Sequence, residues 1–211
     1  MYRLFYYPGN ASFLPHVMLH EIGAAHELVL VDRQQDAHHG ADYLRLNPNG
    51  LIPVLVDGDT VLFETAAIAL YLTERHPEAG LAPLPGTADR AAFLRWMVHL
   101  TNTPQAEFQP WFYPHKFADG AAAQADVKAV AERRMNALFD RIADQLGAGP
   151  YLLGERFSAA DLFLAMLVRW GRTMPRPPSS VPALGALVDR VVARPSVQAA
   201  MAAEGLVGPF A

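Results

Sequence analysis

The 211-residue chain contains no cysteine. It can therefore form no disulfide bond and no thiolate metal site, and it has no cysteine nucleophile of its own. Any sulfur chemistry that this protein performs must use the sulfur of a ligand.

Long apolar runs and an excess of basic charge are also missing. No apolar run approaches the roughly 20 residues that cross a bilayer, and the strand-like sequence after Arg3 leaves no room for the apolar region of a signal peptide. The formal net charge is −4, without a basic stripe for nucleic acid or anionic lipid. We therefore expect a cytoplasmic protein with neither a nucleic-acid nor a membrane partner.

The first 76 residues alternate between strand-like and helical patterns. An Asp-Gly pair between two short apolar runs predicts a β-hairpin, and Ala, Ile and Leu at helical spacing predict the helix after it. We expect strands over 2–7, 27–31, 54–56 and 61–63, helices over 13–22 and 65–74, and a short helix before the Asn47-Pro48-Asn49-Gly50 turn. This order, βαβ followed by αββα, predicts a mixed four-stranded sheet with helices on its faces.

The rest of the chain has a different character. Residues 77–88 are rich in proline, glycine and alanine and read as a linker. Beyond Asp89 we expect only helices, over 89–115, 123–147, 158–172, 182–193 and 195–203. The prediction is a two-domain chain, with an α/β domain over 1–76 and an all-helical domain over 89–211.

Two constellations in the first domain could bind a ligand. Pro53 opens a strand, where prolines are often cis, and an edge strand there could pair with an extended peptide. Glu64 and Thr65 stand where a strand passes into a helix, whose N-terminus favours a carboxylate while Glu64 can pair with an ammonium group. Together they suit an α-amino-acid head group. The alternatives are a strand-initiating proline without a ligand and a plain helix cap.

The loop from Tyr6 to Ser12 brings hydroxyl and amide groups to the start of the first helix. A thiolate would be stabilised there by hydrogen bonds and by the helix dipole. Lowering a thiol pKa by ~2 units takes about 2.7 kcal/mol, which one or two charge-assisted hydrogen bonds and the dipole can supply. The alternative is that Ser12 simply caps the helix.

The eight histidines do not predict a metal site. His16 and His20 are spaced i, i+4 on one helix, but no third ligand is obvious, and the zinc-protease spacing is incomplete. His38 lies in a polar loop and is either solvated or a ligand contact. Ser158 and Asp161 match a capping box, so we interpret Asp161 as structural rather than catalytic.

Taken together, these features resemble the glutathione transferase family, and the bacterial beta class in particular. The resemblance spans nearly the whole chain. It rests on Phe5-Tyr6-Tyr7-Pro8-Gly9, Ser12, Pro15-His16, Val31-Asp32, Asn47-Pro48-Asn49-Gly50, Ile52-Pro53-Val54, Glu64-Thr65-Ala66-Ala67-Ile68, Tyr71-Leu72, 157–161, 194–198 and 203–206.

The resemblance implies a thioredoxin-like first domain that binds glutathione as co-substrate, and a homodimer. It implies that Pro53 is cis, that Val54 pairs with the cysteinyl part of glutathione, and that Glu64 and Thr65 hold its γ-glutamyl group. His38 is a further expected glutathione contact. The helical domain would supply a pocket for a hydrophobic electrophile, lined by aromatic side chains: Phe108, Trp111, Phe112 and Tyr113.

The chain departs from the beta-class pattern at the positions that would activate the thiol. Ala11 stands at the usual loop cysteine, Gln105 and Ala106 at a histidine and a lysine, and Asp36 at a loop lysine. Another group must then stabilise the thiolate, for which we rank Ser12 first, then Asn10, then Tyr6. The expected activity is glutathione transfer. The alternatives are a glutathione-dependent isomerase, lyase or peroxidase, and a non-catalytic glutathione-binding regulatory protein.

Overall fold

The computed structural model describes residues 1–211 and divides into two compact units. One unit combines Met1–Leu84 with Val191–Phe210, and the other comprises Pro85–Arg190 and Ala211. This division differs from the predicted one at the C-terminal end. The last helix belongs with the first unit because it packs against that unit's first helix.

The first unit contains the expected four-stranded mixed sheet. Its strands are β1 (Tyr2–Tyr6), β2 (His26–Leu30), β3 (Val54–Asp57) and β4 (Thr60–Phe63), in the spatial order β2-β1-β3-β4. β1 is parallel to β2 and antiparallel to β3, which is antiparallel to β4. The helix α1 (Phe13–Glu21) connects the two parallel strands, as a parallel pair requires. The predicted thioredoxin-like architecture is confirmed.

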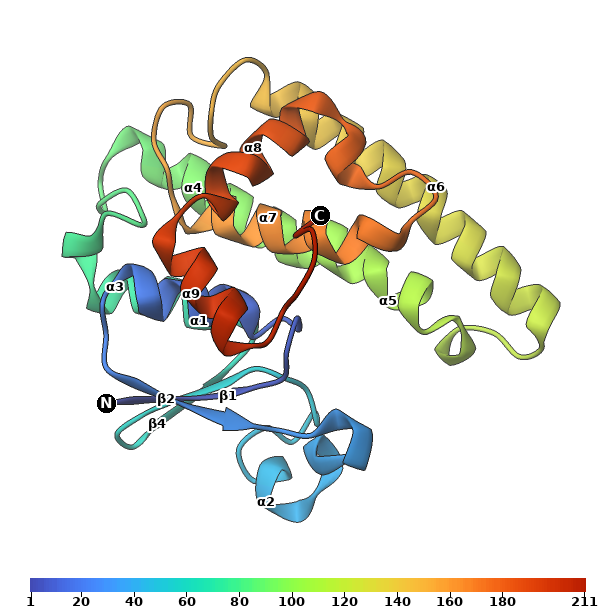
Figure 1. Cartoon of the computed structure of the whole chain (residues 1–211), viewed down its shortest axis with the longest axis horizontal. Helices are drawn as coiled ribbons and strands as arrows, with labels where there is room; N and C mark the ends of the chain where they lie inside the picture. Colours follow the sequence, from blue (N-terminus) through green and yellow to red (C-terminus); the bar gives the residue numbers. More distant parts are fainter. The chain divides into compact units, whose positions relative to one another are not determined.

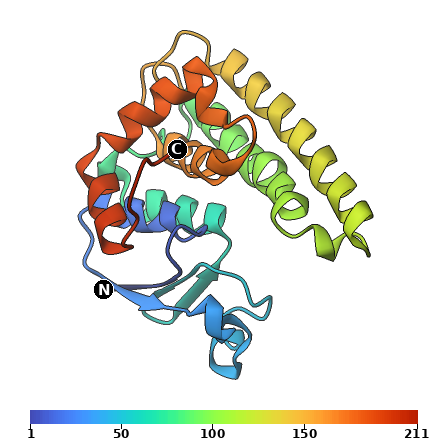
Figure 2. The same cartoon turned by 45° about the vertical axis from the view of Figure 1, so that its right-hand side comes forward.

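Helices cover both faces of this sheet (Figures 1 and 2). α1 and α3 (Thr65–Arg75) pack side by side on one face. On the other face, Phe5 and Val54 form an apolar cluster with Tyr43 of the short helix α2 (Ala41–Leu44). Successive side chains of β1 point to opposite faces of the sheet, so they contribute to two separate apolar layers.

The last helix, α9 (Pro195–Ala203), contacts α1 through packing and through a group of hydrogen bonds around Glu21. Glu21 near the end of α1 accepts two hydrogen bonds from the Arg194 guanidinium, at 2.5 and 2.8 Å, and a third from the Ser196 hydroxyl. These hydrogen bonds join residues that are more than 170 positions apart in sequence.

The second unit is helical. Its helices are α4 (Ala88–Leu100), α5 (Ala106–Phe112), α6 (Ala121–Leu146), α7 (Ala159–Trp170) and α8 (Pro182–Val192), whose last residues belong to the first unit. Residues 159–169 of α7 are all buried, including Asp161 and Arg169, so this helix lies in the core of the unit. None of the helices in the chain combines the length and the apolarity that a membrane crossing requires.

Two local features of the second unit bear on the predictions. The expected helix over 89–115 is interrupted by a π-helical turn at Thr101–Gln105, since Pro104 lacks the N–H that a regular helix needs. The predicted capping box at the start of α7 is confirmed. The Asp161 carboxylate accepts hydrogen bonds from the Ser158 backbone and from the Leu152 N–H, at 2.8 and 2.7 Å.

Candidate functional site

Strand register brings three segments to one end of the sheet. Val54, at the start of β3, pairs with Phe5 on one side and with Phe63 on the other. The strand β1 ends one residue after Phe5, and β4 ends at Phe63. Because these pairs are antiparallel, the loop after β1, the Ile52-Pro53 step and the residues after Phe63 all leave the sheet at the same end.

Glu64 has a backbone conformation that a non-glycine residue rarely adopts. Its φ is 73° and its ψ is 116°, a strained region that often marks functional sites. The side chain is exposed and makes no capping hydrogen bond to α3. Glu64 therefore presents an unpaired carboxylate beside the positive end of an 11-residue helix, and the plain helix-cap interpretation does not account for it.

Thr65 has a different role from the one that its residue type suggested. It is buried, and its hydroxyl donates a hydrogen bond to the Ala11 carbonyl at 3.3 Å. This bond ties the start of α3 to the loop after β1. An anion at this helix end would then be met by the backbone N–H groups of the first turn rather than by the threonine hydroxyl.

The Ile52–Pro53 peptide bond is cis, as the resemblance implies. The expectation that the following strand is an edge strand is wrong, because β3 lies between β1 and β4. Val54 is fully buried and paired on both sides. Ile52 lies just before the strand pairing begins, so its main chain is better placed to pair with an extended ligand. The sequence had not pointed to this residue.

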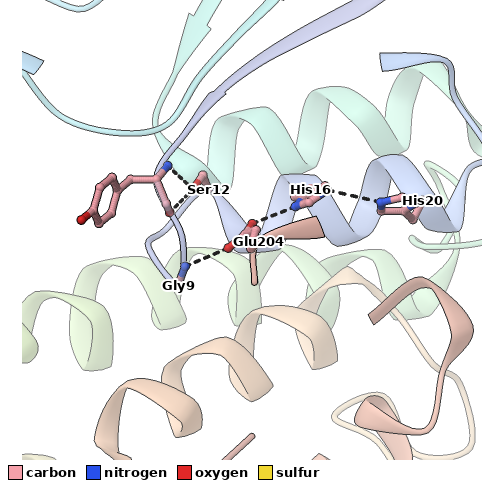
Figure 3. Close-up of polar contacts among 6 residues, drawn as sticks. Gly9, Ser12, His16, His20 and Glu204 are labelled. Carbon is pink, nitrogen blue, oxygen red and sulfur yellow. Dashed lines mark hydrogen bonds and ion pairs between the residues drawn. The ribbon is translucent and has the colours of Figure 1, made fainter. Parts of the chain in front are cut away.

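The hydroxyl of Ser12 forms hydrogen bonds within the first loop (Figure 3). Its hydroxyl donates to the Tyr7 carbonyl at 3.1 Å and accepts from the Tyr7 N–H at 3.3 Å, and the side chain is fully buried. Ser12 stands at the N-cap position of α1 without a side-chain capping bond. The serine therefore closes the loop, and its proton is already committed to a backbone carbonyl.

Asn10 is in a different situation. Its amide oxygen accepts a hydrogen bond from the Arg33 guanidinium at 3.3 Å, and that guanidinium also lies 5.9 Å from the centre of the Tyr7 ring. The carbonyl end of Asn10 is thus fixed by a cation, which leaves the two amide N–H donors for a ligand. Tyr6 by contrast turns toward α1, where its ring lies 6.3 Å from that of His16.

A buried carboxylate from the end of the chain anchors the same loop. Glu204, directly after α9, accepts hydrogen bonds from the Gly9 N–H and from His16 Nδ1, both at 2.8 Å (Figure 3). The side chains of His16 and Glu204 are completely inaccessible to solvent. The position of the loop therefore depends on α1 and on the C-terminal segment.

His38 lies beside the turn that leads into β3. Its side chain is 15% exposed, and its ring lies against that of His39 in a tilted arrangement, with centroids 4.1 Å apart. A Cβ atom on Gly50 would lie 2.7 Å from the His39 ring, so the turn needs a glycine to pack against this loop. The fold thus brings the main chain of His38 against Gly50, two residues before Ile52, and the His38 side chain is largely buried rather than freely solvated.

The four predicted aromatic residues of the helical unit do not share one environment. Phe108 and Trp111 are core residues, whereas Phe112 is 42% exposed. Tyr113 is half-buried at the end of α5. A groove of about 590 Å³ does lie between α5 and α6, but none of these four residues lines it. Its walls are Ala106, Glu107, Pro110, Phe117, Asp126, Val127, Val130, Ala131 and Arg134.

Comparison with known proteins settles the family. Residues 13–75 match the family model described as "Glutathione S-transferase, N-terminal domain", and residues 106–195 match "Glutathione S-transferase, C-terminal domain". The chain is 30% identical over 206 residues to glutathione S-transferase GstA of Escherichia coli O157:H7, covering 97% of this chain and 99% of that one. The chain belongs to the glutathione S-transferase family.

Solved structures of glutathione transferases agree with this assignment. A glutathione transferase homologue from Sulfitobacter, crystallised with bound glutathione, is 29% identical with a TM-score of 0.89 over 98% of this chain and 99% of that one. The beta-class glutathione S-transferase of Sphingomonas chungbukensis is 34% identical with a TM-score of 0.85, covering 97% and 100% of the two chains. The resemblance stated from sequence motifs is confirmed.

Three of the four residues at which this glutathione S-transferase departs from the beta-class pattern have internal partners. The carbonyl of Ala11 accepts the Thr65 hydrogen bond. Gln105 accepts a hydrogen bond from the Thr101 hydroxyl at 3.0 Å, within the π-helical turn. Asp36 lies 2.8 Å from His39 Nδ1. These three residues serve local structure, so the thiol-activating group must be sought elsewhere.

Proposed function

We propose that this protein is a glutathione transferase, which binds glutathione at the end of the sheet described above, stabilises its thiolate and directs it at a hydrophobic electrophile. The observation that carries the proposal is Glu64, a strained, exposed and unpaired carboxylate at the start of α3. Strain of this kind persists only where the surrounding structure imposes it, and a ligand-binding role explains why it is kept.

The binding half of the site follows from the charges of glutathione. Glu64 pairs with the γ-glutamyl ammonium, and the first backbone N–H groups of α3 hold the γ-glutamyl carboxylate. The cysteinyl part extends along the chain before the cis bond at Pro53, where the main chain of Ile52, rather than that of Val54, pairs with it. His38 borders the same turn and contacts the remainder of the tripeptide.

The activating half consists of Asn10 and Arg33. The Asn10 amide donates a hydrogen bond to the sulfur, and the guanidinium behind it adds positive charge to the loop. The thiol proton leaves to solvent, and the sulfur lone pair attacks the electrophilic carbon as the leaving group departs with its electron pair. Ser12 and Thr65 keep the loop in place by their bonds to backbone carbonyls.

The location and the assembly belong to the same proposal. A cytoplasmic location suits a co-substrate that must remain a reduced thiol.

The groove between α5 and α6 suits a homodimer contact because apolar side chains dominate its walls, including Val130, which is 43% exposed.

Calorimetric titration with glutathione tests the binding half. Glu64→Gln should raise the Kd about tenfold or more, since a charge-assisted hydrogen bond contributes roughly 1.5–3 kcal/mol. Glu74→Gln, the same change near the other end of α3, should leave the Kd within about twofold of the wild type.

A second ligand makes the test specific to the ammonium group. N-acetylglutathione lacks that charge, so Glu64→Gln should weaken its binding little. Equal losses for glutathione and N-acetylglutathione, or an unchanged Kd for both, would show that Glu64 does not pair with the ammonium group.

A further inference from the structure

We propose that His16, His20 and His26 form a binding site for a divalent transition-metal ion of the Zn²⁺ type. One nitrogen from each of the three side chains lies within 4.8 Å of the others. The sequence predicted no metal because a third ligand to His16 and His20 was not evident. The fold supplies it by placing the start of β2 beside α1. The proposal does not depend on the transferase activity.

The spacing of the nitrogens suits a small ion. His16 Nε2 and His20 Nε2 are 3.2 Å apart. Two imidazole nitrogens at the usual 2.0–2.1 Å from a tetrahedral Zn²⁺ ion are about 3.3 Å apart. The first two ligands therefore already stand at coordination distance, as i, i+4 residues on one helical face. The His26 nitrogen lies within 4.8 Å of the other two. It therefore needs an approach of at most about 1.5 Å to reach that spacing, which rotation of its half-buried side chain can provide.

Hydrogen bonds hold two of the rings with the correct nitrogen available. His16 Nδ1 donates to the Glu204 carboxylate at 2.8 Å, and His26 Nδ1 donates to the Ala24 carbonyl at 2.8 Å. Both acceptors can only accept, so the proton of each ring is on Nδ1 and its Nε2 carries the lone pair. His16 Nε2 accepts a hydrogen bond from His20 Nε2–H at 3.2 Å (Figure 3). A bound ion would replace that bond, with the His20 proton moving to Nδ1. A carboxylate or carbonyl behind a histidine is the usual outer-shell arrangement of protein metal sites.

The burial of the three residues allows entry from one side. His16 is fully buried, whereas His20 and His26 are half-buried. The rings of His20 and His26 meet edge to face, with centroids 5.0 Å apart. An ion would enter past these two residues, and a water molecule could complete its coordination. Three neutral imidazoles favour Zn²⁺, Ni²⁺ or Cu²⁺ over hard ions such as Mg²⁺.

A second group of possible ligands provides an internal comparison. Asp36, His38 and His39 also lie within 4.8 Å of one another. The centroids of the two histidine rings are 4.1 Å apart, and both rings approach the same carboxylate oxygen, so that they pair with a charge instead of converging on an empty point. Binding at this second group is the main alternative that an experiment must separate.

The test is a titration of chelator-treated, full-length protein without a histidine tag, with Co²⁺ followed by visible absorption and with Zn²⁺ followed by calorimetry. We expect one equivalent to bind, with the absorption bands of a four- or five-coordinate Co²⁺ ion. His26→Phe and His20→Gln should each weaken binding about 100-fold or more, since loss of an outer-shell partner alone costs 10–100-fold. His39→Gln should bind as tightly as the wild type.

Substitution of His16 is avoided because its buried bond to Glu204 supports the fold. Circular dichroism of the metal-free variants checks that they are folded. If His26→Phe does not fold, His20→Gln still tests the proposal. No binding at 100-fold molar excess would overturn the proposal. Retention of tight binding by a folded His20→Gln or His26→Phe variant, or its loss in His39→Gln, would overturn it as well.

Discussion

Asn10 and Ser12 lie two residues apart in the first loop but differ in what they can offer a ligand. The Ser12 hydroxyl is buried and bonded to the Tyr7 backbone in both directions. Asn10 is held at its oxygen by Arg33, so its N–H donors can face a ligand. The structure therefore favours Asn10 as the thiol-activating group over Ser12, which residue types alone had ranked first.

Asn10→Ala should raise the pKa of the bound glutathione thiol by about one unit, because the loss of a charge-assisted hydrogen bond costs roughly 1.5 kcal/mol. Ultraviolet absorbance of the thiolate against pH measures this value. Ser12→Ala should lower the free energy of unfolding by about 1–2 kcal/mol and leave the thiol pKa unchanged. The reverse pattern would restore the sequence-based ranking.

The residues that the sequence revealed are those whose signal is local. Pro53 at a strand start and Glu64-Thr65 at a strand-helix junction could be recognised from their neighbours. Arg33 and Glu204 could not, because each reaches the first loop only through strand register or through docking of the chain end. Parallel pairing of β1 and β2 does bring Tyr6 opposite Leu30, so a topological argument could have pointed to the segment that holds Arg33.

At the scale of elements, the contact between α1 and α9 determines whether the first loop keeps its shape. Burial raises the pKa of Glu21, but hydrogen bonds from Arg194 and Ser196 together lower it more, so that the pKa lies below its usual value. The carboxylate thus favours the folded state when it is ionised. This stabilisation is present above the unfolded-state pKa near 4.5 and is lost as the pH falls through the lower folded-state value.

Glu21→Gln should therefore lower the free energy of unfolding by about 1–3 kcal/mol at pH 7, and the difference from the wild type should shrink below about pH 4.5. Urea denaturation at several pH values measures both quantities. Glu27→Gln, which removes an exposed carboxylate 3.6 Å from Arg3, is the matched control and should change stability by less than about 1 kcal/mol. A pH-independent loss in Glu21→Gln would contradict the argument.

Most elements follow from hydrophobic periodicity, and the exceptions have physical causes. A continuous helix over 89–115 was expected because apolar spacing continues through Pro104. The missing N–H is accommodated by a π turn instead of a break. The edge-strand expectation for β3 failed because periodicity defines a strand but not its neighbours, which depend on how the hairpin docks against β1.

At the scale of the whole molecule, the groove between α5 and α6 is the proposed homodimer contact. Val130→Glu would place a charge on its apolar wall, and we expect it to raise the dimer dissociation constant at least tenfold. Sedimentation velocity over a range of protein concentrations measures this change. Val207→Glu, the same change at a valine that is 91% exposed, should have no effect. An unchanged dimer in Val130→Glu would place the interface elsewhere.

The central claim is that one end of the sheet binds glutathione and stabilises its thiolate without any protein cysteine. The most direct measurement is the thiol pKa of glutathione in the complex, from thiolate absorbance against pH at saturating glutathione. The account predicts a value about two units below that of free glutathione, equivalent to about 2.7 kcal/mol of preferential thiolate binding. Binding with an unshifted thiol pKa would contradict the transferase mechanism and favour a non-catalytic glutathione-binding role, and no binding at millimolar glutathione would contradict both.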